Sequence, residues 1–482
     1  MGSDELLRDA IRDAHLPALM PALAQLTGDL GLVAPGLRPP LPVLPLPAAQ
    51  GGMSPRDQER PRELASAALK RFRDGGGHPA PPPSPADLRT MVQFISRDLS
   101  DDLFELLCHT LDHPADRGRP DWHLDQFGSG RDFTVAIIGA GMSGLGMAHR
   151  LKQAGIPFVV LERNQDVGGT WLVNRYPGCR LDTSNFCYSY SFLQKSDWPQ
   201  YFSAREPIHE YFRKACDTLD LRSHIRFGTT VLSATFDDAA CSWLLRLRNP
   251  DGSEEALTAS AVISAVGQLN RPLYPDLPGR ASFAGPSWHT AEWDDAVPLR
   301  GKRVAVIGTG ASAFQVIPRI ADEAGELRIF QRSPPWALPT PNYQAELAPG
   351  FSWLLAHVPT YHRWYRFFQF ATGVEGRRPF AIVDPEWKEP GSVSSENERL
   401  RQALVNHLAA EFADRPDLLA KVIPQYPPYS KRMLLDDGTW ARTLKKPHVH
   451  LITDAISAID VNGPVTADGV RHEVDAIVYG TG

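Results

Sequence analysis

The sequence has few cysteines and no excess of charge of either sign. Its five cysteines are spread over 482 residues and form neither a CxxC pair nor a metal-ligand spacing, so neither a disulfide scaffold nor a metal site is expected. Fifty basic residues against 56 acidic ones give a net charge of −6, which offers no general attraction for nucleic acid or an anionic membrane. The composition therefore argues against a nucleic-acid partner.

Long hydrophobic runs are also absent. No stretch of 18 consecutive apolar residues occurs, and residues 1–7 are polar and acidic rather than basic and then apolar. The sequence therefore predicts no membrane span and no secretory leader. Together with the odd number of cysteines, this leads us to expect a cytoplasmic protein.

Proline, by contrast, is abundant and clusters in the N-terminal part of the chain. Two proline-rich stretches, residues 35–47 and 79–85, cannot continue a helix and favour extended linkers. Apolar residues recur at helical spacing around them, with Ser84 as the expected N-cap and Pro85 as the first helical residue. We predict a helical N-terminal extension over residues 1–130. It serves packing or dimerisation or, alternatively, docks a partner.

From residue 131 onward the pattern changes to that of an α/β fold. Short apolar runs end in glycine and give way to helical segments, twice over, which is typical of doubly wound parallel sheets. We predict two Rossmann-like dinucleotide-binding domains, over residues 131–270 and 271–482. An aromatic-rich stretch at about 349–429 predicts a helical insertion into the second domain. Its aromatic side chains favour a core, with a substrate pocket or a membrane-facing patch as alternatives.

The first glycine-rich loop follows an apolar run at residues 135–138 and precedes a predicted helix that extends through residue 151. It has glycines at the fingerprint positions Gly139, Gly141 and Gly144. They allow a tight turn and let backbone N–H groups approach a pyrophosphate at the helix N-terminus. Glu162 ends the next apolar run, where a carboxylate accepts hydrogen bonds from ribose hydroxyls. This context predicts a dinucleotide site.

Small and aromatic residues follow that acid. Gly168 and Gly169 suit a backbone that passes close to a bulky cofactor, and Trp171, after Thr170, offers a face for a flat ring. The alternative is an ordinary turn beside a buried tryptophan. Asp182, slightly further on, could equally be a helix cap or half of a surface ion pair.

The second glycine-rich loop follows the apolar run 303–307 and comprises Gly308, Gly310, Ser312 and an alanine at the third small position. The next apolar run ends in Gln331 and Arg332 rather than in an acid. A guanidinium grips a 2′-phosphate through bidentate, charge-assisted hydrogen bonds, whereas a carboxylate repels it. The loop therefore predicts NADPH, unless Arg332 is simply a solvated surface residue. The first site thus has an acid where the second has a cation, which predicts FAD in the first site and NADPH in the second. This pairing of cofactors performs hydride transfer to a flavin.

A longer motif lies between the loops. Its positions are Phe283, Gly285, His289, Trp293 and Asp294, an FxGxxxHxxxW(P/D) pattern. With the stretch 168–182, this pattern resembles the type I Baeyer–Villiger monooxygenases, flavoproteins that insert oxygen beside a carbonyl. Related N- and S-oxygenating flavin monooxygenases have Tyr or Phe where Trp293 stands. The long N-terminal extension resembles the hydroxyacetophenone monooxygenase branch.

The resemblance implies a role for each matching residue. Glu162 would bind the FAD ribose, and Arg332 would hold the NADPH 2′-phosphate with the help of Lys431. The catalytic arginine would be Arg432, although on sequence alone Lys431 and Arg432 could be a solvated basic pair. The residues implied along the flavin or near its reactive face are Gly169, Thr170, Trp171, Asp182 and Tyr188. His289 and Trp293 would shape the inter-domain link.

The resemblance also implies the reaction. NADPH and O₂ would convert a ketone, hydrophobic or aryl, to an ester or lactone through a C4a-peroxyflavin, with Arg432 paired to Asp182 and no metal. The alternatives are an N- or S-oxygenase and a non-catalytic nucleotide-binding protein. Because the family continues beyond the strand and glycine turn at 476–482, we expect a truncated sequence that lacks the C-terminal segment of the FAD-binding domain. We also expect a homodimer through the N-terminal extension.

Overall fold

The computed structural model describes residues 3–41, 49–96, 100–111, 116–127 and 133–482. The predicted boundary between residues 130 and 131 and part of the proline-rich stretch 35–47 lie outside them. The chain divides into two compact units. Unit one comprises the described residues of Met1–Arg117, Leu181–Ser203 and Ser333–Lys445, and unit two comprises those of Gly118–Arg180, Ala204–Arg332 and Lys446–Gly482. These units are defined by packing, whereas the predicted domains were defined by the cofactor that each would bind. The predicted domain bounds, 1–130, 131–270 and 271–482, therefore stay a prediction.

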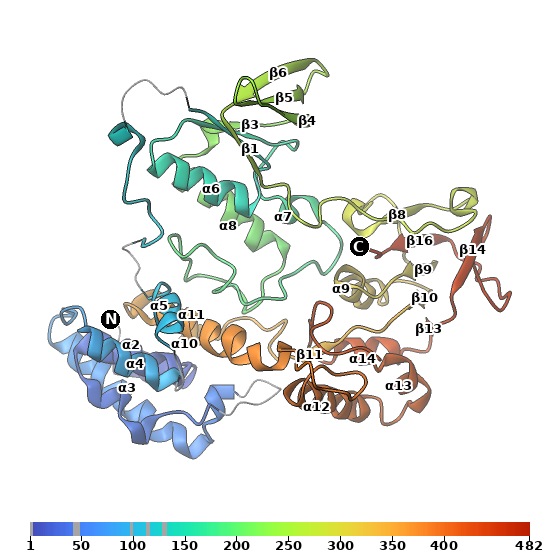
Figure 1. Ribbon diagram of the computed structural model, residues 1–482. Coiled ribbons are helices and arrows are strands. Elements are labelled where there is room, and N and C mark those ends of the chain that lie inside the picture. The colour runs from blue at the N-terminus through green and yellow to red at the C-terminus, as the bar shows by residue number, and fades with distance from the viewer. Residues whose placement is uncertain (1–2, 42–48, 97–99, 112–115, 128–132) are drawn as a thin grey trace. The chain divides into compact units, whose positions relative to one another are not determined.

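Unit two contains a four-stranded parallel sheet around the first glycine loop. Its strands are β1 (Val135–Ile138), β2 (Phe158–Leu161), β3 (Ile225–Arg226) and β7 (Ala261–Ser264), in the order β3-β2-β1-β7. Ile138 pairs with Leu161 on one side and with Ser264 on the other, so the strands end together. The helices of this region are α6 (Met142–Gln153), α7 (Thr170–Val173) and α8 (Arg205–Thr218) (Figure 1). The strand order is that of a Rossmann mononucleotide-binding half.

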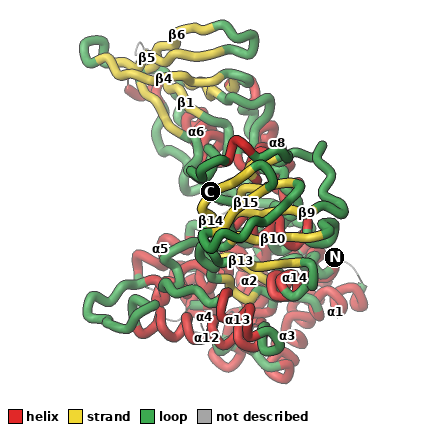
Figure 2. Tube along the Cα trace, turned by 90° about the vertical axis from the view of Figure 1, so that its right-hand side faces the viewer, coloured by secondary structure: helices red, strands yellow, loops and turns green. Residues whose placement is uncertain are grey.

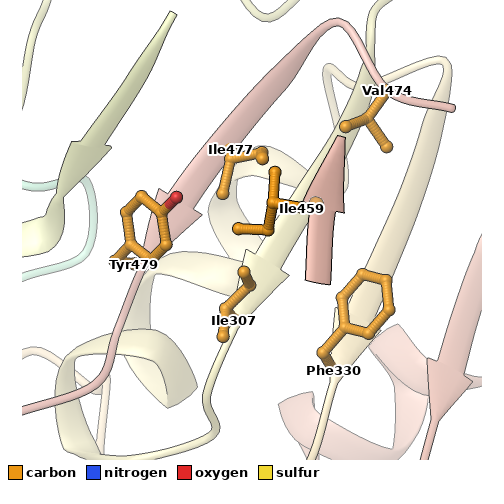
Figure 3. Close-up of a cluster of buried hydrophobic side chains, with 7 residues drawn as sticks. Ile307, Phe330, Ile459, Val474, Ile477 and Tyr479 are labelled. Atoms are coloured by element: carbon orange, nitrogen blue, oxygen red, sulfur yellow. The ribbon is translucent and has the colours of Figure 1, made fainter. Parts of the chain in front are cut away.

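A second parallel sheet in unit two repeats this order. It runs β13-β10-β9-β16-β8 and comprises β9 (Arg303–Ile307), β10 (Glu326–Phe330), β13 (Val449–Ile452), β16 (Ala476–Tyr479) and β8 (Ser287–His289). Helix α9 (Ala311–Ile320) follows β9. Figure 3 shows part of the core on this sheet, where Ile307, Phe330 and Ile477 pack with Ile459, Val474 and Tyr479. The predicted fold class, with two Rossmann-like halves, is confirmed.

Unit two also contains antiparallel strands that the sequence analysis did not predict. Strands β4 (Thr230–Asp237), β5 (Ser242–Arg248) and β6 (Glu254–Ala259) lie side by side in a separate sheet, and β14 (Ile456–Asp460) pairs with β15 (Gly463–Thr466) (Figure 2). Leu245 and Leu247 of β5 are fully buried, whereas Leu244 is 48% exposed. This alternation is the period of a half-buried strand and was visible in the sequence.

The N-terminal part of unit one is helical, as predicted. It contains α1 (Asp4–Arg12), α2 (Leu16–Thr27), α3 (Pro55–Asp74), α4 (Pro85–Ile95) and α5 (Asp101–Cys108). The hydroxyl of Ser84 accepts a hydrogen bond from the backbone N–H of Asp87 at 3.2 Å, and Pro85 is the first helical residue, so the predicted N-terminus of α4 is confirmed. Short 3₁₀ turns punctuate both units at 30–33, 35–37, 49–52, 124–127, 222–224, 280–282, 290–292 and 375–381.

The aromatic-rich stretch folds as helices within unit one. These are α10 (Pro349–His357), α11 (Tyr361–Phe368), α12 (Ser395–Glu411) and α13 (Pro416–Val422), with a π-helical turn at Gln369–Val374. The flanking strands β11 (Ala337–Pro339) and β12 (Leu434–Asp436) pair in parallel, and α14 (Thr439–Leu444) follows. Four of its aromatic side chains, Trp364, Tyr365, Phe367 and Phe368, are buried, so this group is core. It gives no information on the substrate, and a hydrophobic or aryl ketone stays a prediction.

No helix in the described part of the chain combines the length and the apolarity needed to cross a membrane. Likewise, the described residues contain no group of three or more His, Cys, Asp or Glu side chains placed to hold a metal ion. The predicted homodimer stays a prediction.

Asp436, at the end of β12, provides a pH-dependent test of the fold of unit one. Burial raises the pKa of its carboxyl from 3.8 to about 6, so the folded state holds the proton more tightly than the unfolded state. Stability is therefore lost as pH rises through this window. In Asp436→Asn the amide oxygen still accepts from the Trp440 N–H, which is 3.2 Å from Oδ1. We expect urea unfolding to show a gain of up to about 3 kcal/mol at pH 8.

The same variant should gain only about half as much at pH 5, because the wild-type carboxyl is then largely protonated in the folded state. Asp238→Asn, at an exposed position, is the matched control and should change stability equally little at both pH values. A gain that does not depend on pH would contradict the assignment.

Candidate active site

Steric constraints require glycine at the first loop. Gly139 has a φ of 104°, and a Cβ there would lie 2.6 Å from the carbonyl oxygen of Ala265. A Cβ on Gly144 would lie 1.9 Å from the carbonyl oxygen of Gly139. Gly141 is the N-cap of α6, so the loop leads directly into the N-terminus of a helix, where backbone N–H groups favour an anion. The geometry fits a pyrophosphate.

The Glu162 carboxylate lies against this loop. Its Oε2 accepts a hydrogen bond from the backbone N–H of Ala140 at 2.7 Å, and its Oε1 accepts from the N–H of Asn164 at 2.8 Å. The residue follows β2 and is only 4% exposed. A buried carboxylate beside the glycine loop is the acceptor that a ribose requires, so the position predicted for Glu162 fits a dinucleotide.

The Gly168–Trp171 segment packs on the same loop. The N–H of Gly168 donates to the carbonyl oxygen of Ala140 at 3.1 Å, and a Cβ on Gly169 would lie 3.0 Å from the Cα of Gly141. Thr170 begins α7, and Trp171 in its first turn is buried. The structure thus brings Gly169, Thr170 and Trp171 to the first glycine loop, while their contacts with a flavin stay predictions.

The second loop has the same backbone shape. Gly308 also has a φ of 104°, and a Cβ there would lie 2.4 Å from the carbonyl oxygen of Gly480. Gly310 is the N-cap of α9, and Ser312 lies half-buried in its first turn. The third small position differs between the two loops. Gly144 faces Ala265 in the first, whereas Ala313 faces Gly480 in the second, so each pair keeps one glycine.

This exchange of glycine and alanine predicts a compensating pair of mutations. A Cβ on Gly480 would lie 2.6 Å from the Cβ of Ala313, so we expect Gly480→Ala to cost about 1–3 kcal/mol by overpacking. Adding Ala313→Gly should restore much of that loss, although glycine in the helix itself costs about 1 kcal/mol. Urea unfolding of both single variants and the double variant gives the interaction energy. Gly373→Ala, where no atom lies within 4 Å of the new Cβ, is the control. If the double variant lost the sum of the two single losses, the contact between positions 313 and 480 would be contradicted.

Arg332 follows β10, the strand that pairs with the loop-bearing strand β9. Gln331 before it is buried, and its N–H donates to the carbonyl oxygen of Ile452 at 2.8 Å, whereas the Arg332 side chain is exposed. Gln331 is the counterpart of Glu162, because each directly follows the strand next to the loop-bearing one, and Arg332 lies one residue further on. A cation there suits the 2′-phosphate of NADPH.

Asp182 and Arg432 both belong to unit one and lie close together. Nη1 of Arg432 is 4.0 Å from Oδ2 of Asp182, a long ion pair in which the arginine side chain is 57% exposed and the aspartate side chain 16%. The other oxygen, Oδ1, accepts a hydrogen bond from the hydroxyl of Tyr343 at 2.7 Å. Tyr343 is buried and was missed by the sequence analysis, because no motif marks the segment between β11 and α10.

Lys431 and Tyr188 also lie in unit one. Nζ of Lys431 donates to the hydroxyl of Ser333 at 2.9 Å and lies 4.3 Å from the centre of the Tyr426 ring, a cation–π contact. Tyr188 is half-buried, and its N–H donates to the carbonyl oxygen of Ser184 at 2.9 Å. The implied roles of these residues stay predictions.

His289 and Trp293 occupy the end of β8 and the turn after it, in unit two. Nδ1 of His289 accepts a hydrogen bond from the N–H of Ala291 at 3.1 Å, and burial lowers the pKa of the ring. The Trp293 ring packs edge to face on Trp288, with ring centres 5.7 Å apart. These contacts place both residues at the end of the edge strand and in the turn after it, and their implied role in an inter-domain link stays a prediction.

Two Rossmann-like halves, one loop followed by an acid and the other by an arginine, define a flavoprotein that also binds a pyridine nucleotide. Residues 132–345 match the family model for flavin-binding monooxygenase-like proteins. The chain is 37% identical to an uncharacterized monooxygenase, y4iD, of Sinorhizobium fredii, over 99% of this chain and 71% of the relative. It is 37% identical to a Baeyer–Villiger monooxygenase of Streptomyces coelicolor, over 72% of this chain and 64% of the relative.

The solved structure of OTEMO in complex with FAD and NADP superposes with a TM-score of 0.62 at 30% identity, over 73% of this chain and 71% of that chain. The chain therefore belongs to the flavin-binding monooxygenases and, among them, to the type I Baeyer–Villiger monooxygenases. It spans about two thirds of the length of these relatives. The resemblance to the hydroxyacetophenone monooxygenase branch stays a prediction.

Proposed function

We propose that this chain carries out a Baeyer–Villiger oxidation, in which a ketone, O₂, NADPH and a proton give an ester or lactone, NADP⁺ and water. The observation that carries the proposal is the pair of equivalent glycine loops whose next strands end differently, in the acid Glu162 after β2 and in Gln331 and the cation Arg332 after β10. One loop suits a ribose with free hydroxyls, and the other suits a ribose with a 2′-phosphate. Their combination suits FAD with NADPH.

The residues present fit FAD at the first loop. The N–H groups at the start of α6 would hold its pyrophosphate, Glu162 its ribose, and Gly169, Thr170 and Trp171 would lie along its ring system. When bound, the flavin accepts a hydride from NADPH and activates O₂. At the second loop, Gly308, Gly310 and Ser312 would hold the NADPH pyrophosphate and Arg332, assisted by Lys431, its 2′-phosphate.

Arg432 is the proposed catalytic residue. Its guanidinium would stabilise the negative charge that develops on the ketone oxygen as the carbonyl carbon is attacked, because a fixed cation offsets that charge without reorganisation. Asp182 would hold the guanidinium in place, since its Oδ2 already lies 4.0 Å from Nη1. Tyr188 would line the same reaction site.

The remaining parts of the proposal concern substrate and setting. We propose a hydrophobic or aryl ketone as the substrate and the cytoplasm as the location. A homodimer through the N-terminal helices is the proposed assembly.

The experiment has two stages on the 482-residue chain with added FAD. In the first, the flavin absorption band is followed without oxygen, and NADPH should bleach it faster than NADH does. In the second, air is admitted with a panel of aryl, cyclic and linear ketones and one aryl sulfide. Ester or lactone supports the proposal. Sulfoxide as the sole product indicates an S-oxygenase instead, and failure to retain flavin indicates a chain without this activity.

A further inference from the structure

The N-terminal helices and the inserted helices pack as one body within unit one. Helix α2 packs against α11 (Figure 1), and α1 packs against α10. The N–H of His15 donates to the hydroxyl of Tyr361 at 2.8 Å, and Nε1 of Trp364 donates to Oε1 of Gln25 at 2.7 Å. Burial lowers the pKa of His15 to about 3, so a neutral ring packs on Phe368 with ring centres 4.3 Å apart. The N-terminal helices therefore hold α11 in place.

Helix α11 in turn holds the segment 181–203, here called the Asp182 segment. Nη1 of Arg366 donates to the carbonyl oxygens of Phe186 and Ser189, the latter at 3.2 Å. The Phe186 ring, which is 1% exposed, packs edge to face on Tyr365 with centres 4.9 Å apart. Arg366 itself is only 6% exposed, and hydrogen bonds from a cation are about twice as strong as neutral ones.

The Asp182 segment is closed by hydrogen bonds between its two ends. The N–H of Leu181 donates to the carbonyl oxygen of Ser203 at 3.1 Å. Nδ2 of Asn185 donates to the Ser203 hydroxyl at 2.8 Å, and the N–H of Ser203 donates back to Oδ1 of Asn185 at 2.9 Å. Asn185 and Ser203 are fully buried. Packed chains of this kind transmit displacements between sites.

We infer that Arg366 is a positioning residue for the reaction and that the N-terminal helices act through it. Arg366 holds the backbone between Asp182 and Tyr188, and the N-terminal helices hold Arg366. The N-terminal extension is thus a support for the reaction site. The inference rests on the proposed function, in which Asp182 holds Arg432 and Tyr188 lines the site.

Arg366→Met tests the inference, because it removes both carbonyl contacts and keeps most of the side-chain volume. We expect the ester formed per NADPH consumed to fall about fivefold, the balance being lost as hydrogen peroxide. Flavin reduction by NADPH should change less than about twofold, because the glycine loops and Arg332 belong to unit two. Hydrogen exchange of the amides in the Asp182 segment should rise. Arg366→Lys keeps a hydrogen-bond donor, so its ester yield per NADPH should lie between those of Arg366→Met and the wild type.

A second variant, with a matched control, tests the contact between the N-terminal helices and α11. Gln25→Leu removes the hydrogen-bond acceptor of Trp364. It should also lower the ester formed per NADPH consumed, but by less than Arg366→Met does. Gln58→Leu removes a hydrogen bond to the carbonyl oxygen of Met53, before α3, and one from Arg62 in α3, and it should leave the ester formed per NADPH unchanged. If Arg366→Met does not fold, Arg366→Lys and Gln25→Leu test the inference in its place. An unchanged ester yield per NADPH in both variants overturns it.

In a folded Arg366→Met, an unchanged ester yield per NADPH overturns the inference even where exchange rises, because Arg366 is then only structural. Unchanged exchange overturns it as well, because the Asp182 segment is then held by other contacts. A wild-type chain that bleaches with NADPH yet forms no ester from any ketone refutes the proposed function instead.

Discussion

Arg432→Ala leaves reduction of the flavin by NADPH largely intact and lowers ester formation about 10²- to 10³-fold, which is the expected cost of removing a fixed cation from developing negative charge. The reason lies in the separation of roles. Arg432 belongs to unit one, whereas the glycine loops, Glu162 and Arg332 belong to unit two. Stopped-flow absorbance of the flavin gives the reduction rate, and gas chromatography of the product gives the ester.

Two further variants sharpen this prediction. Arg432→Lys keeps the charge but not the planar fork, so it should recover only a small part of the activity. Arg415→Ala removes a partly exposed arginine of unit one that pairs with Asp417 at 2.7 Å, and it should leave ester formation unchanged. A normal ester yield from Arg432→Ala would remove Arg432 from its proposed role.

Arg332→Ala raises the KM for NADPH about 10- to 100-fold while changing the KM for NADH less than about twofold, because the lost charged hydrogen bonds go to the 2′-phosphate alone. The exposed side chain follows β10, where the first sheet has the buried Glu162 after β2. Anaerobic flavin bleaching at a series of nucleotide concentrations measures both constants without involving a ketone.

The control for this second prediction lies on the same strand. Arg328 pairs with Glu326 at 2.8 Å, so Arg328→Ala removes a positive charge of β10 that is already neutralised. Its effect on the KM for NADPH should stay below about twofold. Equal increases of the KM for NADPH and NADH in Arg332→Ala would show that Arg332 does not read the 2′-phosphate.

The two cofactor loops could be predicted from sequence because their signals are local. Strand, glycines, helix and the residue after the next strand all lie within about 30 residues, the span of one βαβ unit. The structure gives Gly139 and Gly308 the same φ of 104°, and it puts Glu162 within hydrogen-bond reach of the first loop. The helical N-terminus and insertion were likewise readable from apolar spacing.

The support of the reaction site could not be predicted from sequence, because its contacts join distant positions. Tyr343 reaches Asp182 across 161 positions, and Arg366 reaches Phe186 across 180. Neither residue belongs to a motif, and a tyrosine or an arginine in a helical, aromatic-rich stretch has many ordinary roles. The pairing of Asp182 with Arg432 was implied only by the family resemblance, and the structure adds that Tyr343 binds the other carboxylate oxygen.

The most direct measurement of the central claim follows the oxygen atom itself. The FAD-loaded chain is supplied with NADPH, an aryl ketone and ¹⁸O₂, and the product is examined by mass spectrometry. A Baeyer–Villiger oxidation predicts an ester that carries one labelled oxygen, placed between the carbonyl carbon and the migrating group. An unlabelled product, or NADPH consumed with hydrogen peroxide as the sole oxygen product for every ketone, would contradict the account.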